Sequence, residues 1–511
     1  MSDFLLELLS EEIPARMQKQ ARQDLARLFE AELKEVGLAA EAIETYSTPR
    51  RLALIARGLP TETQAVSEER RGPRADAPDK AIEGFLRSTG LSRGDLKERE
   101  EKKGSFLYAV IDIPGRKTKA LLAEAIPKIV RNFPWPKSMR WGEGSASTES
   151  LRWVRPLQSI VAILGDDLVA CEVGGVASGV ETLGHRFHHP GRITIGGAFD
   201  YAEKLEACHV IVDHKRREGI IRERADALAE QAGLKRVQDT GLVEENAGLT
   251  EWPVPLLGGF DPTFLAVAPE AITLAMRTHQ KYFACEDGDG NLAPNFICVA
   301  NIEAGDGGEA ITRGNERVLA ARLADAKFFW EQDLATPLEE QAKKLDQIVF
   351  HEKLGTVADK VDRVAKLARW LVEEGIVGAS APAKAGAQSG GSVDIDTEEL
   401  DSRLRGKTEL ADKAETAARL AKADLVTGTV GEFPELQGIV GGYLAEAQGL
   451  DPEIAAAIRD HYKPVAQGDQ PQVDPPAVAD PGEGRAQVAG LQQGVVPIGQ
   501  PAPDLRRLPH A

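Results

Sequence analysis

Hydrophobic residues in this 511-residue chain follow two periodicities, one typical of strands and one typical of helices, without a regular β-α-β order. Residues 3–9 form a short apolar run that predicts a buried strand, and Pro14 opens a helical pattern that continues to about Glu35. Segments of both kinds recur up to about residue 345, after which nearly every pattern is helical. This irregular mixture predicts an α+β fold, with mixed N-terminal regions followed by a mostly helical region.

The length predicts more than one domain, because at about 150 residues per domain the chain has room for about three cores. We predict an α+β domain at 1–150, a strand-rich α+β domain at 151–345 and a helical domain at 346–464. A disordered insert is expected within the helical domain at 378–407, where Gly, Ala and Ser dominate the low-complexity stretch. Residues 465–511 are rich in Pro, Gly, Gln, Ala and Val, which predicts a disordered or aberrant tail.

Individual elements follow from the same periodicities and from turn residues. We expect helices at 77–88, 117–132, 215–231, 314–330, 356–374, 406–420, 434–447 and 452–462. We expect strands at 106–113, 157–164 and 168–173, with Gly165-Asp166-Asp167 as a hairpin turn and a second turn at 287–291 between strands.

Composition limits the class of protein. The net charge is −18, from 80 acidic and 62 basic residues, which argues against non-specific nucleic-acid binding over the whole surface but allows a local basic patch. No run of about 18 apolar residues occurs, so we predict no transmembrane helix. The four cysteines, at 171, 208, 285 and 298, form no C-x-x-C pair, and together with the absence of a signal peptide this predicts a cytoplasmic protein.

Short blocks that mix basic and aromatic residues are the candidate binding sites, because such side chains hold phosphates and stack on bases. Arg140 lies between tryptophans in residues 133–142, where the alternative is that it covers a buried Trp. Arg155 stands three residues after Arg152, so on a strand the two would point to opposite faces.

Two further blocks carry histidines. His185 and Arg186 lie in residues 182–190, for which a structured loop, a polar ligand surface and a metal site are the alternatives. The adjacent His188 and His189 would diverge on a strand, so we predict no metal there. Residues 276–283 are expected to end a helix and start a strand, and their cations could serve either phosphates or the helix dipole. The candidates in this last block are Arg277, His279 and Lys281. We expect Arg140, Arg186 and Lys281 to lie near one another or along one face.

We do not predict that this chain catalyses a reaction by itself. The sequence contains no G-x-x-x-x-G-K-[ST] and no strand followed by G-x-G-x-x-G, and we assign no catalytic residue. The helical region offers a possible His-Asp-type metal phosphohydrolase, with His351 and Asp424 as candidate ligands. Ala423 stands where the His of the His-Asp doublet would be, so we predict a degenerate domain without metal.

Taken together, the blocks resemble the β subunit of the bacterial two-subunit glycyl-tRNA synthetase, in family order from about Met1 to Pro464. The segments that carry the resemblance are 4–14, 48–52, 71–73, 135–141, 155–157, 184–187, 251–253, 279–283, 314–316, 320–330, 351–355 and 433–438.

The resemblance implies that a separate α subunit carries the ATP, Mg²⁺ and glycine chemistry, and that this chain has no cofactor of its own. It implies docking on α, binding of tRNA(Gly), a hetero-tetramer of two α and two β chains, no membrane association, and an isolated chain that is inactive. Because no anticodon-binding domain follows Pro464, the chain is interpreted as C-terminally truncated or frameshifted. A metal-dependent phosphohydrolase and a non-catalytic scaffold remain as alternatives.

Overall fold

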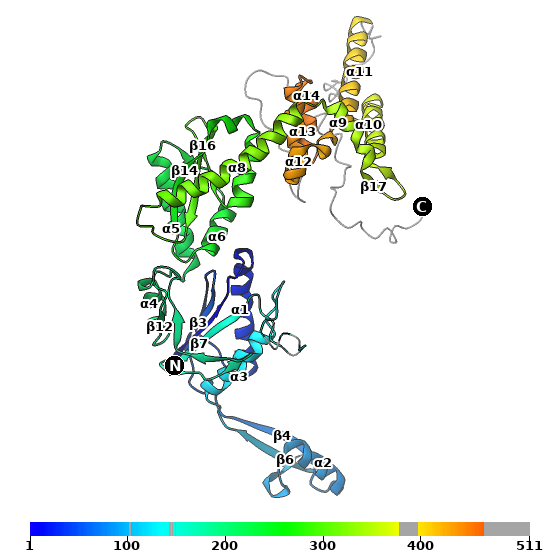
Figure 1. Cartoon of the computed structure of the whole chain (residues 1–511). Coiled ribbons are helices and arrows are strands. Elements are labelled where there is room, and N and C mark those ends of the chain that lie inside the picture. The colour runs from blue at the N-terminus through cyan, green and yellow to red at the C-terminus, as the bar shows by residue number, and fades with distance from the viewer. Residues whose placement is uncertain (102–103, 143–144, 146, 149, 378–396, 464–511) are drawn as a thin grey trace, which may run out of the picture. The chain divides into compact units, whose positions relative to one another are not determined.

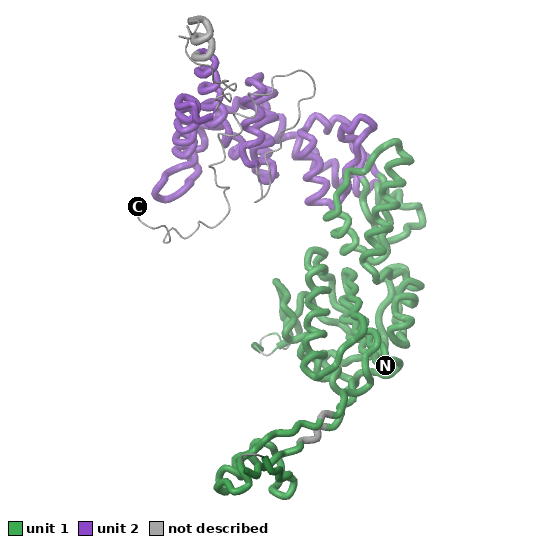
Figure 2. The backbone as a smooth tube through the Cα atoms, turned by 180° about the vertical axis from the view of Figure 1, so that it is seen from behind, with its two compact units in different colours: residues 1–257, 297–312 green, residues 258–296, 313–511 purple. Residues whose placement is uncertain are grey.

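The computed structural model describes residues 1–101, 104–142, 145, 147–148, 150–377 and 397–463 (Figure 1). The chain is divided into two compact units (Figure 2). Unit 1 comprises Met1–Leu257 and Ile297–Thr312, and unit 2 comprises Gly258–Phe296 and the chain from Arg313 onward. Strands and helices occur in both, with nearly all of the strands before residue 301, which confirms the predicted α+β class. The predicted tail lies outside the described residues.

The central sheet of unit 1 has the strand order β2-β3-β1-β7-β10-β9, with β8 paired to β7. Its strands are β1 (Ser2–Ser10), β2 (Ala42–Ser47), β3 (Arg51–Leu59), β7 (Leu157–Leu164), β8 (Asp167–Leu168), β9 (Glu172–Val173) and β10 (Val176–Gly179). Strand β1 runs antiparallel to both of its neighbours, so that Leu6 lies opposite Leu54 and Ala162. The N-terminal strand predicted from the apolar run is therefore confirmed as the centre of a sheet.

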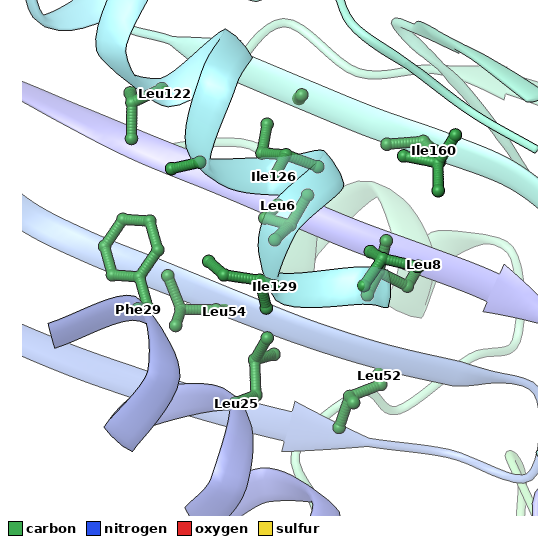
Figure 3. Close-up of a cluster of buried hydrophobic side chains, with 14 of the residues drawn as sticks. Leu6, Leu8, Leu25, Phe29, Leu52, Leu54, Leu122, Ile126, Ile129 and Ile160 are labelled. Carbon is green, nitrogen blue, oxygen red and sulfur yellow. The ribbon is translucent and has the colours of Figure 1, made fainter. Parts of the chain in front are cut away.

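Both faces of this sheet are covered, which explains why β1 is apolar at successive positions. On one face Leu6 and Leu8 pack with Phe29 of α1 (Ala15–Glu35) and Ile126 of α3 (Thr118–Arg131) (Figure 3). On the other face Leu5 packs with side chains of α4 (Tyr201–Ala207). Because side chains alternate along a strand, the even residues of β1 serve one layer and the odd residues serve the other.

Between β3 and α3 the chain forms a small appended sheet of order β4-β6-β5 with one helix (Figure 1). Its elements are β4 (Val66–Arg74), α2 (Asp79–Thr89), the 3₁₀ turn η1 (Arg93–Asp95), β5 (Leu96–Glu101) and β6 (Gly104–Ile113). The entering and leaving strands are joined at their base, where Thr63 N donates to Arg116 O over 3.0 Å. We call residues 62–117 the appended sheet.

The rest of unit 1 is built on helices and one short strand pair. Strands β11 and β12 pair with each other. Arg217 of helix α5 is fully buried and donates to the carbonyls of Ser47 and Ala247. The elements are β11 (Glu181–Leu183), β12 (Arg192–Thr194), α5 (His214–Gln231), β13 (Lys235–Arg236) and α6 (Thr240–Leu249). The division between the units runs through β14 (Val254–Gly259), β16 (Leu292–Ala300) and α8 (Glu309–Leu334).

Unit 2 joins a strand-containing part to a helical part. The first part holds the 3₁₀ turn η3 (Pro262–Ala266), α7 (Pro269–Leu274), the π-helical turn η4 (Ala275–Gln280) and β15 (Phe283–Glu286). The second part holds α9 (Leu338–Lys343), η5 (Lys344–Gln347), β17 (Val349–His351), β18 (Gly355–Thr356), α10 (Val357–Glu373), α11 (Thr397–Leu420), η6 (Ala423–Val426), α12 (Gly428–Glu432), η7 (Pro434–Leu436), α13 (Ile439–Ala447) and α14 (Pro452–Asp460). Helices α10 and α11 pack through alanines and Val372.

Several predicted element boundaries are wrong. Helix α8 begins at Glu309, five residues before the predicted start at Gly314. The strand expected at 168–173 is split into β8 and β9, because residues 169–171 leave the regular ladder: Cys171 N donates to the Ser178 hydroxyl over 2.9 Å in place of a strand carbonyl. Helix α11 begins at Thr397, inside the predicted 378–407 insert, since the Glu, Leu and Arg residues there favour a helix. The helix expected at 434–447 begins only at Ile439, after Gly438 at φ +86°. Of the helices in the described ranges, none is long and apolar enough to cross a membrane.

Candidate nucleic-acid interface

A buried network of charges in unit 1 joins sequence blocks that lie up to about 240 residues apart. Arg51 is fully buried, with its Nε 3.2 Å from Glu7 Oε2 and its Nη1 paired with Glu251. Tyr201 donates its hydroxyl to Glu7 over 2.5 Å, and Thr48 donates to Glu251 over 2.9 Å. Because removing one partner of a buried ion pair costs about 3–5 kcal/mol, this network fixes the relative positions of the blocks that it joins.

The same arginines hold the loop that carries two of the predicted contacts. Arg51 donates to the carbonyl of Leu183, and Arg50 donates to the carbonyl of Gly184 over 2.9 Å and to Glu251 over 2.9 Å. A side chain at Gly184 would meet the carbonyl oxygen of His189 at 2.4 Å from its Cβ, so the loop closes only with glycine there. Charges that look like surface residues in the sequence therefore build the support of this loop.

His185 lies in the interior and not on the surface. It is fully buried, and its Nδ1 accepts hydrogen bonds from the backbone N–H groups of Phe187 (3.3 Å) and His188 (3.2 Å). Burial lowers the pKa of His185, which favours the neutral ring that this acceptor role requires. Of the predicted alternatives for this block, the structured loop describes His185, and the ring holds the backbone of Phe187 and His188.

The two residues directly after His185, Arg186 and Phe187, are exposed to solvent. Arg186 is exposed with its Nη1 3.1 Å from Glu12 Oε1, and the Phe187 side chain is 66% exposed. Beside them His188 stacks on His209 at 4.6 Å between ring centroids, and His209 lies 4.8 Å from Trp252. The loop thus presents one cation and one aromatic ring next to a stack of half-buried rings.

Arg140 and Arg155 are both exposed, and each is close in sequence to a tryptophan of an aromatic cluster. Trp153 is fully buried, and its backbone forms a two-way bridge with Met139, which places Arg140 close to the 152–155 segment. Trp135 is also buried, with its ring 5.0 Å from that of Trp153, whereas Trp141 is only partly buried against the same core. The expected opposite orientation of the arginines at 152 and 155 does not apply, because β7 begins only at Leu157 and neither arginine lies on a strand.

In unit 2 the predicted block 276–283 forms the end of a helix. Arg277 and His279 lie exposed on the π-helical turn η4, and Lys281, half-buried, ends it in the left-handed region at φ +62°. Tyr282 anchors the block, since its hydroxyl donates to Asn315 over 2.6 Å and its ring stacks on Phe296 at 4.6 Å. The prediction that a helix ends here and a strand follows at β15 is confirmed.

Two other sequence blocks position this turn. Asn315, from the block 314–316, accepts the hydrogen bond of Tyr282, and the ring of His279 lies 6.2 Å from the buried ring of Phe433. The structure therefore brings Arg277, His279 and Lys281 together in unit 2. It places the other candidate residues in unit 1, so the expected common face for Arg140, Arg186 and Lys281 stays a prediction.

The helical part contains a buried polar cluster where a His-Asp site was considered. His461 Nδ1 must donate to the carbonyl of Ile458 at 2.6 Å, which leaves its Nε2 as the acceptor for Lys422 Nζ at 2.7 Å. Lys422 also lies 3.5 Å from the centroid of the Tyr462 ring. Asp424 accepts from Gly438 N at 2.5 Å and from Gly441 N at 3.1 Å.

Burial governs the titration of this cluster. It lowers the pKa of Lys422 to about 7, raises that of Asp424 to about 6 and lowers that of His461 to about 3. His351, the other candidate ligand, is exposed at the end of β17. In the parts of the chain that the structure describes, no three His, Cys, Asp or Glu side chains are grouped as metal ligands. The role supported by these contacts is structural: the hydrogen bonds of Asp424 and His461 join η6, α13 and the end of α14.

A family model described as "Glycyl-tRNA synthetase beta subunit" matches residues 4–479, and the chain belongs to this family. The match extends beyond Pro464, where the resemblance from the motifs ended.

Similar curated proteins carry the same description, "Glycine--tRNA ligase beta subunit". The relative from Phenylobacterium zucineum is 48% identical over 471 residues, covering 92% of this chain and 65% of the relative. The relative from Paracoccus denitrificans is 45% identical over 486 residues, and the one from Rhodospirillum centenum is 44% identical over 504 residues. Each of these alignments covers 94% of this chain and 66% of the relative. The chain therefore spans just under two thirds of the length of these relatives.

Proposed function

We propose that this chain is the tRNA-binding subunit of a glycine–tRNA ligase and that it docks on a separate catalytic α subunit. The observation that carries the proposal is the turn at the end of α7 in unit 2. There Arg277 and His279 are both exposed on one turn, and Tyr282, which follows the turn, is anchored by its hydrogen bond to Asn315. Membership of the glycyl-tRNA synthetase beta subunit family supplies the substrate class.

In this proposal the two subunits divide the work. The α subunit holds ATP with Mg²⁺ and glycine and forms the activated amino acid, and the present chain positions tRNA(Gly) for transfer. No cofactor is assigned to this chain, and the complex is expected to contain two copies of each subunit in the cytoplasm. The isolated chain is expected to be inactive in adenylate formation.

The charge distribution favours a local contact over a general one. At a net charge of −18 the protein repels RNA over most of its surface, so that cations presented on exposed turns determine where RNA approaches. Arg140, Arg155 and Arg186 in unit 1 are the other exposed cations assigned to this role. Each phosphate contact releases counterions, and this gives the proposal a measurable salt dependence.

Binding of tRNA(Gly) to the reconstituted α–β complex, measured against salt concentration, tests the proposal. Arg277→Gln should weaken binding and reduce the slope of log K against log salt by about 0.7–0.9 per lost contact. Arg363→Gln, which makes the same charge change on the exposed surface of α10, should keep the wild-type slope and serves as the matched control. Equal slopes for Arg277→Gln and wild type, in a folded complex, would refute this assignment of the turn.

A further inference from the structure

The appended sheet has two faces of different character. One face carries α2, whose Ile82 is buried, as are Leu107 and Ala109 of the central strand β6. Gly72 of β4 lies on this side, where a Cβ would stand 2.3 Å from the ring of Phe85 in α2. The sequence block Arg71-Gly72-Pro73 thus includes a position at which only glycine lets the helix approach the sheet.

The opposite face, which we call the open face, displays aromatic residues between cations. Phe106 and Tyr108 of the central strand alternate with the buried residues and are half-exposed. Tyr108 lies opposite Arg71 of β4 and Lys97 of β5, and Phe106 lies opposite Arg99 of β5. Because paired residues of an antiparallel sheet point to the same side, all five side chains belong to the open face.

The arginines lie on the rings. The guanidinium carbon of Arg71 is 3.9 Å from the centroid of Phe106, and that of Arg99 is 5.1 Å from the centroid of Tyr108. Each stack therefore offers a flat guanidinium surface. About half of each arginine side chain is exposed to solvent, 49% for Arg71 and 54% for Arg99. A nucleobase has the size and shape to extend such a stack, since bases stack on arginine planes as well as on aromatic rings.

Carboxylates from the far strands hold the arginines in place. Arg71 Nη2 lies 2.8 Å from Glu101 Oε2, and Arg99 Nη1 donates to Glu69 Oε2 over 2.9 Å, so each ion pair joins the two outer strands β4 and β5. Tyr108 donates its hydroxyl to Glu101 as well. Ion pairs this exposed contribute little stability, so an incoming anion can compete for the arginines at small cost.

We propose that the open face binds unpaired nucleotides of RNA, with bases on the Arg71–Phe106 and Arg99–Tyr108 stacks and phosphates replacing Glu101 and Glu69 as arginine partners. The inference rests on the proposed function for the choice of RNA and adds a second surface, in unit 1, to the basic turn of unit 2. A protein partner would need a larger apolar patch than two rings covered by guanidinium groups.

Binding of a fluorescein-labelled single-stranded 12-nucleotide RNA to the full chain, without α subunit, tests this inference. Arg71→Gln and Arg99→Gln should each weaken binding by about five- to tenfold, from lost stacking and a lost phosphate contact. Arg70→Gln is the matched control, because Arg70 neighbours Arg71, carries the same charge, pairs with Glu68 and lies on the face of α2. It should stay within about twofold of wild type.

Glu101→Gln provides a test of opposite sign. Removing this carboxylate eliminates the competitor for Arg71 and one repulsive charge, so RNA affinity should rise by about two- to fivefold. Loss of folding cannot mimic a gain of affinity. A duplex of the same sequence should bind more weakly than the single strand, because its bases are not available for stacking.

The outcomes separate this inference from the proposed function. If Arg71→Gln and Arg99→Gln bind the single strand like wild type while circular dichroism shows them folded, the open face does not bind RNA, whatever the α–β complex does with tRNA. If they lose single-strand binding while Arg277→Gln keeps the wild-type salt slope for tRNA, RNA binding by the open face is supported and the assignment of the unit 2 turn as a tRNA contact is refuted.

Discussion

Replacing Glu251 with Gln is predicted to destabilise unit 1 while preserving the volume of the side chain. The Glu251 carboxylate is buried and accepts from Arg50, Arg51 and Thr48. A glutamine keeps one oxygen but turns an amide N–H₂ toward arginine donors. Arg51, fully buried, then retains only Glu7 as a counter-charge.

The magnitude follows from burial. Leaving a buried ion without one of its partners costs about 3–5 kcal/mol, which we expect for Glu251→Gln. Glu44→Gln is the control, because its ion pair with Arg57 at 3.1 Å is exposed, with 40% of the Glu44 side chain accessible. Exposed pairs contribute about 0.2–1 kcal/mol, so the two identical chemical changes should differ severalfold in free energy.

Hydrogen exchange resolves this effect better than a global melting curve, since a chain with two compact units need not unfold in one step. A loss of 3 kcal/mol corresponds to roughly 100-fold faster exchange for β1 amides, such as those of Leu6 and Leu8, when they open with unit 1. Exchange in unit 2 should be unchanged. Equal β1 exchange in Glu251→Gln and Glu44→Gln would refute the structural role of the network.

The pH dependence of the same network has a definite sign. Although burial opposes ionisation of Glu251, the charges of Arg51 and Arg50 lower its pKa below the usual carboxyl value. A lowered carboxyl pKa contributes stability that is present above the unfolded value of about 4.3 and is lost as pH falls through the lower folded value. Unit 1 of the wild type should therefore lose this contribution in acid, whereas Glu251→Gln should not show this component.

Two further outcomes are expected. Because burial lowers the pKa of Lys422 to about 7, the free energy of unfolding of the helical part should rise between about pH 7 and 10, where the unfolded amine still binds a proton. Urea unfolding at pH 7 and pH 9 should show this rise in wild type and not in Lys422→Met; equal rises would contradict the assignment. Gly184→Ala should destabilise unit 1 by about 1–3 kcal/mol, because its Cβ would stand 2.4 Å from a backbone oxygen. Gly219→Ala, in α5 with open space around its Cβ, should instead be neutral or stabilising by about 0.5–1 kcal/mol in the same urea titration.

Local pattern predicted much of the fold. The apolar run of β1 and the amphipathic spacing of α1 appear where expected, because alternation and the 3.6-residue period record which side chains are buried. One boundary failed where a glycine with positive φ determines the path, at Gly438 before α13. A single sequence does not mark which glycine takes that conformation.

The candidate site was less predictable, because its organisation depends on long-range pairing. Arg51 and Glu251 look like surface charges in the sequence, and only the tertiary structure shows that they neutralise each other in the interior. For His185 the sequence left a structured loop and a polar ligand surface as alternatives, and only the tertiary structure shows that the ring is buried. The spacing of Phe106 and Tyr108 is the signal that could have indicated the open face, but both faces of β6 are apolar, so alternation alone does not identify the exposed one.

Charging of tRNA(Gly) with glycine, by this chain mixed with a family α subunit, tests the central claim most directly. The complete β subunit from Phenylobacterium zucineum is the positive control, and each chain alone is the negative control. We predict ATP-dependent formation of glycyl-tRNA in the mixture, above the level of either chain alone, and a decrease with Arg277→Gln. If the mixture gives no more glycyl-tRNA than α alone while the control β subunit restores charging, this chain is not a functional tRNA-binding subunit.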